Sequence, residues 1–429
     1  MHLKVPQFPL RNKQNVVWCW TAAACYAAVG ASFWTEGGKF CIFSFERVAR
    51  IRSGGLVSIL GIDTGIVKPL KRIGIVIGGG DCPGLDSAVC GIAKPALTHF
   101  GVSVIGVLDG FEGLVEGKSR EILAKEIVGM SSCGSMNLGT SQKGDPSNFP
   151  VDIPQGVDIL DCSENAIRNY RAWNLDALIA LGGDGTMHVI DKLSDLGLNC
   201  LGVPKTIDND LCATDASFGC DSALAIATEA IDRLYAAAST RQRVVIVEVA
   251  GRYSGWVALG AGLSCGVDFI LIPEIPFRWD NVCEQLSKRG KQGSGLVTIC
   301  AAEGARLAEM ESLAKEKGHV HADSGRFSGI GDLIGRKLAE MTRLDTRTIP
   351  LGHLQRSGRA TAYDRLLASR FGVKVLHLAS QEMYGQMVSL KGTEVVGVPV
   401  KEAILRLNTV PLDSQLVAAA RAAGVSFGD

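Results

Sequence analysis

Short apolar runs recur along the chain from residue 70 onward, and each has the length and composition of a buried parallel strand. These runs lie at Arg72–Ile77, Ser103–Leu108, Ala177–Leu181, Cys200–Val203, Arg243–Val249, Asp268–Ile272 and Leu296–Ala301. Helices are predicted between them at Leu85–Thr98, Ser163–Trp173, His188–Leu196 and Asp221–Ala237. Repeated strand, loop and helix units imply parallel sheets joined by right-handed crossovers, so the pattern predicts an α/β fold.

The segment from Ala177 to Asp210 contains two of these strands, and a polar loop follows each of them. In open α/β sheets ligands bind at the carboxyl ends of the strands, so both loops are expected to face one crevice. The first loop, 182–186, is glycine-rich, which lets backbone N–H groups approach a polyphosphate, and its Asp184 suits Mg²⁺. The second loop, 204–210, adds carboxylates and a hydroxyl that suit a base acting on a sugar hydroxyl. Together the loops predict phosphoryl transfer.

Another glycine-rich turn, Gly78–Gly84, joins the first predicted strand to the first predicted helix. Backbone N–H groups and the helix dipole at such a turn form an anion site. The turn lacks the GxGxxG spacing of a dinucleotide fingerprint and the GK[ST] of a P-loop, so a plain connection remains the alternative. Residues 134–150 are expected to form a polar surface loop, and the charged stretch 285–325 is expected to face solvent.

Composition narrows the class of protein. The 429 residues suggest two or three domains, and 47% hydrophobic residues with 51 glycines fit a soluble α/β enzyme. Lys+Arg and Asp+Glu both total 44, so no net field attracts nucleic acid or an anionic membrane, and neither partner is predicted. The 13 cysteines form no CxxC pair, which indicates an intracellular protein with reduced thiols and argues against zinc.

Residues 1–68 do not share this pattern. Basic residues at Lys4, Arg11 and Lys13 precede an uncharged run from Gln14 to Thr35, the outline of a signal peptide or a membrane span. The low acidic content also fits an organelle transit sequence, and a non-functional extension from an early start is a further alternative. The sequence leaves targeting and a non-functional extension open, with a membrane anchor less favoured.

Five motifs carry a resemblance to a known family. They are GGDGT (182–186), PKTIDND (204–210), QRVVIVEVAGR (242–252), AAEG (301–304) and LGHLQRSG (351–358). In this order and spacing the chain resembles the 6-phosphofructokinases from about Lys71 to residue 405. GGDGT also occurs in lipid and NAD kinases, but PKTIDND with LGHLQR downstream is specific. The resemblance implies transfer of a phosphoryl group to the 1-hydroxyl of fructose 6-phosphate, as in glycolysis, by a cytoplasmic, Mg²⁺-dependent, allosteric homodimer or homotetramer.

The resemblance also implies roles for single residues. Asp208 would be the base, with Thr206, Asp210 and Arg252 around the transferring group, and Asp184 would hold Mg²⁺. The donor would be bound by Gly79, Gln142, Lys143, Gly185, Thr186 and Lys205. The sugar phosphate would be bound by Thr206, Asp208, Arg243, Ala250, Gly251, Arg252, Glu303, Arg347, His353 and Arg356. Arg243 and Arg347 would reach in from a neighbouring subunit, which makes an oligomer necessary.

Three positions depart from the family pattern. Gln142 stands where an arginine is common, with Lys143 next to it as a possible replacement for the charge. Ala250 replaces a usual methionine beside the sugar, and Asp86 replaces a usual asparagine in the first glycine turn.

Two positions bear on the phosphoryl donor. Family members that use pyrophosphate carry aspartate at the place of Gly185, where an acidic side chain would intrude on the α-phosphate of ATP. Gly185 leaves that space open, whereas Lys205 is found with either donor, so the pair favours ATP over pyrophosphate. A pyrophosphate-dependent enzyme and a catalytically weak regulatory subunit remain the alternatives.

The fold that follows has two Rossmann-like lobes with mainly parallel sheets and the active site in the crevice between them. Residues 1–68 are an N-terminal extension, 69–219 with 355–405 form the donor lobe, and 220–354 with 406–429 form the sugar-phosphate lobe.

Overall fold

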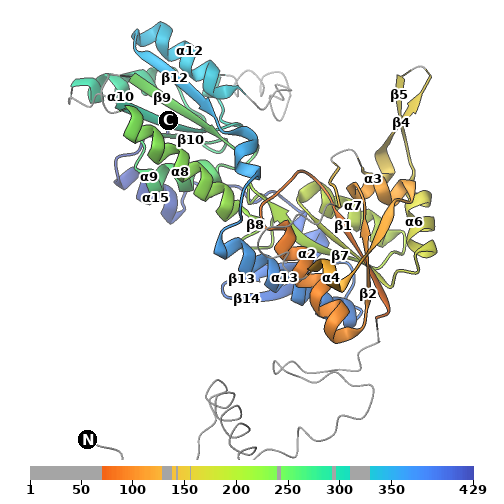
Figure 1. Ribbon diagram of the computed structural model, residues 1–429. Helices are drawn as coiled ribbons and strands as arrows, with labels where there is room; N and C mark the ends of the chain where they lie inside the picture. The colour runs from red at the N-terminus through yellow and green to blue at the C-terminus, as the bar shows by residue number, and fades with distance from the viewer. Residues whose placement is uncertain are drawn as a thin grey trace, which may run out of the picture. The chain divides into compact units, whose positions relative to one another are not determined.

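Two sheets of mainly parallel strands carry the fold, and helices cover their faces (Figure 1). The computed structural model describes residues 70–127, 138–141, 144–154, 156–238, 243–291, 296–309 and 329–429. These residues belong to one compact unit, 66–429. The predicted α/β class is confirmed, and the predicted N-terminal extension lies outside the described residues.

The first sheet has the strand order β14-β13-β7-β6-β1-β2-β3, and β8 pairs with β7. Its strands are β1 (Arg72–Ile77), β2 (Ser103–Val107), β3 (Ser119–Ile122), β6 (Ala177–Gly182), β7 (Cys200–Thr206), β8 (Phe218–Gly219), β13 (Gln386–Lys391) and β14 (Glu394–Pro399). Its helices are α2 (Leu85–Pro95), the π-helix η1 (Ala96–Phe100), α3 (Gly110–Glu116), α4 (Ala124–Ile127), α6 (Ser163–Ala172), α7 (Asp184–Asp195), α13 (Ala362–Ser380) and α14 (Val400–Ala403).

The second sheet has the order β10-β11-β9-β12 and is parallel throughout. Its strands are β9 (Arg243–Val249), β10 (Phe269–Leu271), β11 (Leu296–Ala302) and β12 (Asp345–Pro350). The helices with it are α8 (Cys220–Ala238), α9 (Trp256–Cys265), α10 (Trp279–Lys291), α12 (Ile330–Thr342) and α15 (Gln415–Ala422), and the 3-10 turn η3 (Gly352–Arg356) follows β12. The sequence predicts that 285–325 faces solvent; residues 292–295 and 310–325 lie outside the described residues, and β11 between them is buried because it is a central strand.

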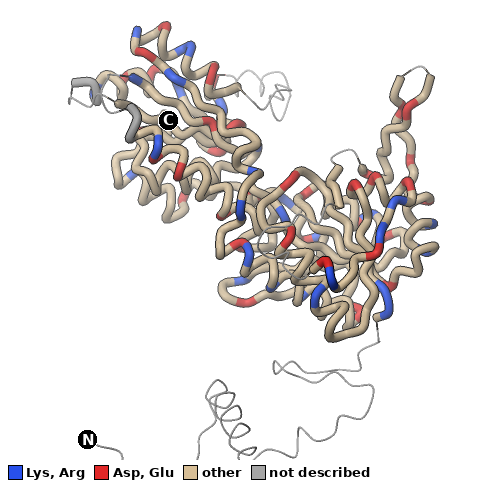
Figure 2. The backbone as a smooth tube through the Cα atoms, viewed as in Figure 1, with Lys and Arg blue, Asp and Glu red and all other residues tan. Residues whose placement is uncertain are grey.

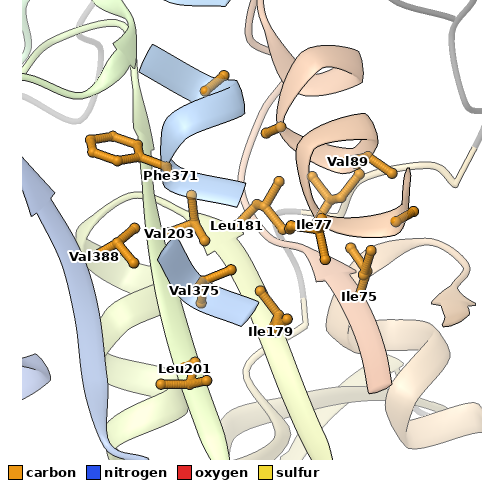
Figure 3. Packing of buried hydrophobic residues seen from close by; sticks show 14 of the residues in the cluster. Ile75, Ile77, Val89, Ile179, Leu181, Leu201, Val203, Phe371, Val375 and Val388 are labelled. Carbon is orange, nitrogen blue, oxygen red and sulfur yellow. The ribbon is translucent and has the colours of Figure 1, made fainter. Parts of the chain in front are cut away.

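Alternating side chains of the central strands fill a separate hydrophobic cluster on each face of the first sheet. On one face Ile75 and Ile179 pack with Val89 of α2 and Phe371 of α13 (Figure 3). Helices α2 and α13 approach closely on this face, since a Cβ added to Gly372 would lie 2.5 Å from the carbonyl carbon of Gly91. These buried layers hold the strand ends, and therefore the loops that follow them, in fixed positions.

A hairpin of β4 (Phe149–Ile153) and β5 (Gly156–Leu160) follows the short 3-10 turn η2 (Pro146–Asn148). The sequence predicts a polar loop over 134–150, part of which lies outside the described residues, and its end instead forms η2 and the start of β4. All five residues of β5 are exposed. Without a buried face, its sequence lacks the apolar pattern by which a strand is predicted.

Lysine, arginine, aspartate and glutamate are interspersed over the elements of both sheets (Figure 2). Within the described ranges, none of the helices is long and apolar enough to cross a membrane.

Candidate active site

Three loops meet where β1, β6 and β7 end. The three strands are parallel neighbours, so their carboxyl ends share one edge of the sheet. A cleft of about 440 Å³ opens there. It is lined by Gly79, Gly80, Cys82, Gly183, Asp184, Gly185, His188, Lys205, Thr206, Asp208, Asp210, Arg252, Tyr253, Arg356, Ile404, Arg406 and Leu407. The crevice predicted for the two loops of 177–210 therefore exists, and the first glycine turn contributes to it as well.

The loop after β6 is the first turn of a helix. The sequence predicts a helix from His188, but α7 begins at Asp184, with Gly183 as its N-cap. The sequence does not reveal this helix start because its residues are mostly glycine. Glycine is needed there because the backbone packs tightly: a Cβ on Gly182 would lie 2.0 Å from Thr186 Oγ1. Free backbone N–H groups at this helix end suit phosphate oxygens.

Asp184 and Gly185 lie in that first turn and line the cleft. A Cβ on Gly185 would meet no atom within 4 Å, so the space in front of this residue is open. Burial raises the pKa of the Asp184 carboxyl, while His188, whose Nε2 lies 3.7 Å from Asp184 Oδ2, lowers it. A partly buried carboxylate at a phosphate-binding helix end fits a divalent cation, which would restore the lost solvation.

Hydrogen bonds hold together the loop after β7. Thr206 Oγ1 donates to Asp210 Oδ1 at 2.9 Å and accepts from the Asp208 N–H at 3.1 Å. Asn209 has a left-handed backbone (φ 51°), and its Oδ1 accepts from the Ser217 N–H at 3.0 Å. Asparagine tolerates this conformation better than most residues, which explains its place between the two aspartates.

Asp208 has the electrostatics of a base. Among the described residues its Oδ1 is buried without a hydrogen-bond partner. Burial, followed by the charges of Asp210 and Glu303, raises the pKa of Asp208 to about 7, although Arg356 and the Arg252 N–H lower it. A carboxylate with a pKa near neutrality accepts a proton from a substrate hydroxyl better than an ordinary aspartate.

Lys205 forms the floor of the cleft. Its side chain is buried, and its Nζ donates to the Gly80 carbonyl oxygen in the first glycine turn. Burial lowers the pKa of Lys205 to about 8. Gly79 beside it has a left-handed backbone (φ 74°), which favours glycine in this turn. The turn is therefore tied to the cleft and is more than a plain connection.

Arginines from the second sheet face these loops. Arg252 follows β9, and its guanidinium carbon lies 4.9 Å from the centre of the Tyr253 ring. Arg356 ends η3 and donates through Nη1 to the Asp81 carbonyl oxygen at 3.3 Å. Gln355 is buried and accepts through Oε1 from the Ala250 N–H at 3.1 Å, which holds η3 against the end of β9.

The remaining described residues with predicted roles do not line the cleft. Thr186 and Ala250 are buried, and Gly251 has φ 137°. Burial raises the pKa of the Glu303 carboxyl, and the positive charges of Arg356 and Arg252 lower it. His353 is exposed in η3, while Gln142 and Lys143 lie outside the described residues. Asp86 lies in the first turn of α2, where a negative charge is favourable.

Arg243 and Arg347 do not line the cleft of their own chain. Arg243 begins β9, whereas Arg252 follows the other end of that strand, about 20 Å away at the usual rise per residue. Arg347 lies on edge strand β12, exposed, with Nη2 3.5 Å from Asp345 Oδ1. Neither side chain lines the cleft.

The motifs leave several lining residues unassigned. Gly80 and Gly183 belong to the glycine turns, and His188 lies one helical turn after Asp184, so spacing could have indicated them. Ile404, Arg406 and Leu407 follow α14 and lie far along the sequence from the other loops. No local signal marks them, because only tertiary structure brings this segment to the cleft.

Comparison with known proteins identifies one family, by a family model and by individual relatives alike. A family model described as Phosphofructokinase matches residues 72–379. The chain is similar to an ATP-dependent 6-phosphofructokinase of Chloroflexus aurantiacus, with 42% identity over 360 residues that cover 84% of this chain and 98% of the relative. It is also similar to ATP-dependent 6-phosphofructokinase 1 of Synechocystis sp., with 39% identity, 84% of this chain and 99% of the relative.

Solved structures share the fold. Phosphofructokinase from Saccharomyces cerevisiae aligns with a TM-score of 0.65 and 28% identity over 82% of this chain, which spans 46% of the yeast chain. A pyrophosphate-dependent phosphofructokinase from Marinobacter aquaeolei aligns with a TM-score of 0.67 and 21% identity, over 83% of this chain and 92% of that chain.

Proposed function

Because the chain belongs to the phosphofructokinase family, we propose that it transfers the terminal phosphoryl group of ATP to the 1-hydroxyl of fructose 6-phosphate. The products are fructose 1,6-bisphosphate and ADP. The observation that carries this proposal is the position of Asp208, with a pKa of about 7, in one cleft with Asp184 and Arg252. Phosphoryl transfer needs positioning and charge neutralisation, and this cleft offers both.

Asp208 accepts the proton of the 1-hydroxyl as the oxygen attacks the terminal phosphorus. Thr206 and Asp210 keep the loop in place through their mutual hydrogen bond, and Arg252 neutralises charge on the transferring group. A lipid or NAD kinase built on the same glycine motif would not need the sugar-phosphate arginines, so they favour the sugar substrate.

Donor binding is assigned to Gly79, Gly185, Thr186 and Lys205, and by the family resemblance also to Gln142 and Lys143. The open space at Gly185 favours ATP over pyrophosphate. Asp184 would hold Mg²⁺, which supplies positive charge to the donor phosphates when bound.

The sugar phosphate is assigned to Arg252, Arg356, Glu303 and His353 with the backbone at 250–251. Arg243 and Arg347 serve the cleft of a neighbouring subunit, because neither side chain lines the cleft of its own chain, so a homodimer or homotetramer is part of the proposal. The lobe boundaries at 219, 355 and 405 and the cytoplasmic location stay predictions.

Shared sites allow a subunit-mixing test. Asp208→Asn and Arg347→Ser are each expected to be nearly inactive alone, because one lacks the base and the other lacks a phosphate-binding cation. Mixed subunits combine an intact base from one chain with an intact arginine from the other, so activity should reappear after the two variants are dissociated and reassembled together. The mass of the reassembled protein would show whether it contains both variants. If such a mixed oligomer stayed inactive, Arg347 would act within its own subunit or not at all.

The pH dependence follows from the raised pKa of Asp208. Below about pH 7 the free enzyme holds this carboxyl protonated, so kcat/KM for fructose 6-phosphate should fall about tenfold per pH unit on the acid side. Initial rates between pH 5 and 9 at saturating ATP would measure this. A profile that stays flat down to about pH 5 would contradict the assignment of Asp208 as the base.

The decisive assay supplies purified protein with fructose 6-phosphate and Mg²⁺, with ATP and pyrophosphate in parallel. Turnover with ATP alone supports the proposal, and turnover with pyrophosphate alone would replace the donor. No turnover with either would favour the regulatory-subunit alternative, which rests only on Gln142 and Asp86.

A further inference from the structure

Residues 404–408, which we call the C-terminal strap, form a wall of the cleft to which no motif points. Ile404, Arg406 and Leu407 of this strap line the cleft together with Asp184 and the other loop residues. The strap follows α14 directly. The proposed function leaves its arginine without a role.

Hydrogen bonds fix the strap to the loop that carries Asp208. The Asn408 N–H donates to the Asp210 carbonyl oxygen, and Asn408 Nδ2 donates to the Asn209 carbonyl oxygen, both at 2.8 Å. Leu407 pairs with Leu211 in an antiparallel bridge. The backbone on the C-terminal side of Arg406 is therefore held against the base-bearing loop and does not hang free in solvent.

The other end of the strap faces the donor side of the cleft, because Ile404 and Arg406 line it together with Gly185 of α7. Helix α14, which precedes the strap, packs against α7, and Lys401 Nζ of α14 lies 3.4 Å from Asp195 Oδ1 at the C-terminal end of that helix. At the C-terminal end of the strap, Trp256 Nε1 donates to the Asn408 carbonyl oxygen at 2.8 Å, which joins this end to α9 beside the second sheet. Arg406 thus lies between the helix end that suits donor phosphates and the loop that carries the base.

The charge of Arg406 is available for a ligand. Within the described ranges, its guanidinium forms no hydrogen bond or ion pair, although the cleft contains three carboxylates. By contrast, Arg356 donates to Asp81, and both Arg252 and Arg356 act on the charge of Glu303. An unpaired arginine fork on a held segment matches phosphate oxygens, which it can bind bidentately.

We propose that Arg406 binds oxygens of the donor's polyphosphate chain, and this inference rests on the proposed kinase function. Arg406 lines the cleft together with Gly185 and His188 of the donor helix α7, whereas the arginines assigned to the sugar phosphate follow strands of the second sheet. With Lys205 on the floor, the donor would lie between cations from two distant parts of the chain.

The test compares Arg406→Gln and Arg406→Lys with Leu405→Ala. Leu405 is a neighbour that is 80% exposed and does not line the cleft, so its variant controls for disturbance of the strap. We expect Arg406→Gln to raise KM for ATP about tenfold, since a charge-assisted hydrogen bond is lost, while KM for fructose 6-phosphate stays within twofold. Arg406→Lys should give an intermediate rise, and Leu405→Ala none.

Calorimetric titration with a non-hydrolysable ATP analogue in the presence of Mg²⁺ and absence of sugar measures the same loss without turnover. An unchanged analogue affinity in Arg406→Gln, or an effect confined to KM for fructose 6-phosphate, would overturn the inference. If the unaltered enzyme binds the analogue but turns over nothing, the proposed function fails, and the titration still decides the role of Arg406. Unchanged unfolding temperatures of the variants would exclude a loss of folding as the cause.

Discussion

Asp208→Asn is expected to lower kcat by about 10²–10⁴-fold, because the 1-hydroxyl loses the group that accepts its proton. Asparagine has the shape of aspartate, so the hydrogen bond between Thr206 and Asp210 and the Asp208 N–H bond to Thr206 should remain. KM for ATP should therefore change little. Steady-state rates with both substrates varied would measure the effect, and an unchanged kcat would remove Asp208 from the mechanism.

The same variant should be more stable than the unaltered enzyme at pH 8. The pKa of Asp208 is about 7 in the folded state against 3.8 as its ordinary value, so ionisation disfavours the folded state as pH rises through this range. Removing the charge should then raise the free energy of unfolding by on the order of 4 kcal/mol at pH 8. The difference should vanish near pH 4, where the carboxyl is protonated in the folded state and becomes so in the unfolded state.

Asp158→Asn provides the matched control for both measurements, since Asp158 is exposed in the β4–β5 hairpin. It should change neither kcat nor the free energy of unfolding by a measurable amount. If the control variant gained as much stability as Asp208→Asn, the general reduction of negative charge would explain the gain.

Gly185→Asp is expected to reduce ATP-dependent activity by about 100-fold or more, because a negative side chain would enter the space for the donor phosphates and repel them. The fold should tolerate the change, since a Cβ at this position meets no atom within 4 Å and its backbone needs no left-handed conformation. Initial rates with ATP and with pyrophosphate, together with a thermal melt, would measure both consequences.

Gly185→Asn separates charge from size at the same position. It should retain clearly more ATP activity than Gly185→Asp if repulsion is the main cause. Equal losses in the two variants would mean that bulk alone excludes the donor. Gly182→Ala offers the opposite contrast, because its Cβ would collide with Thr186 and the variant is expected to fold poorly.

The strands and the glycine loops could be predicted from the sequence because their signals are local. The run Arg72–Ile77 is β1 without adjustment, since six consecutive apolar or boundary residues suffice to identify a buried parallel strand. The start of α7 was placed too late, at His188 instead of Asp184, because glycine is a poor helix former and only the packing of Gly182 on Thr186 reveals the turn.

The contribution of the C-terminal strap could not be predicted in this way. Arg406 lies beside the base-bearing loop through the hydrogen bonds of Asn408 and the pairing of Leu407 with Leu211, and nothing in the spacing of residues 404–408 marks them as part of a cleft. Strand β5 could not be predicted either, because strand prediction depends on a pattern of buried residues and every residue of β5 is exposed. Tertiary contacts between distant segments decide both cases.

The tie between Asn408 and the base-bearing loop also sets an order of events during synthesis. The Asn209 carbonyl oxygen cannot accept its hydrogen bond from Asn408 until the ribosome has added 199 further residues. The last residues likewise complete the second sheet, since the Ile270 N–H donates to the Ser426 carbonyl oxygen at 2.9 Å. A nascent chain therefore carries every catalytic motif while still lacking a finished cleft, and it gains catalytic competence only once its tail has emerged and docked.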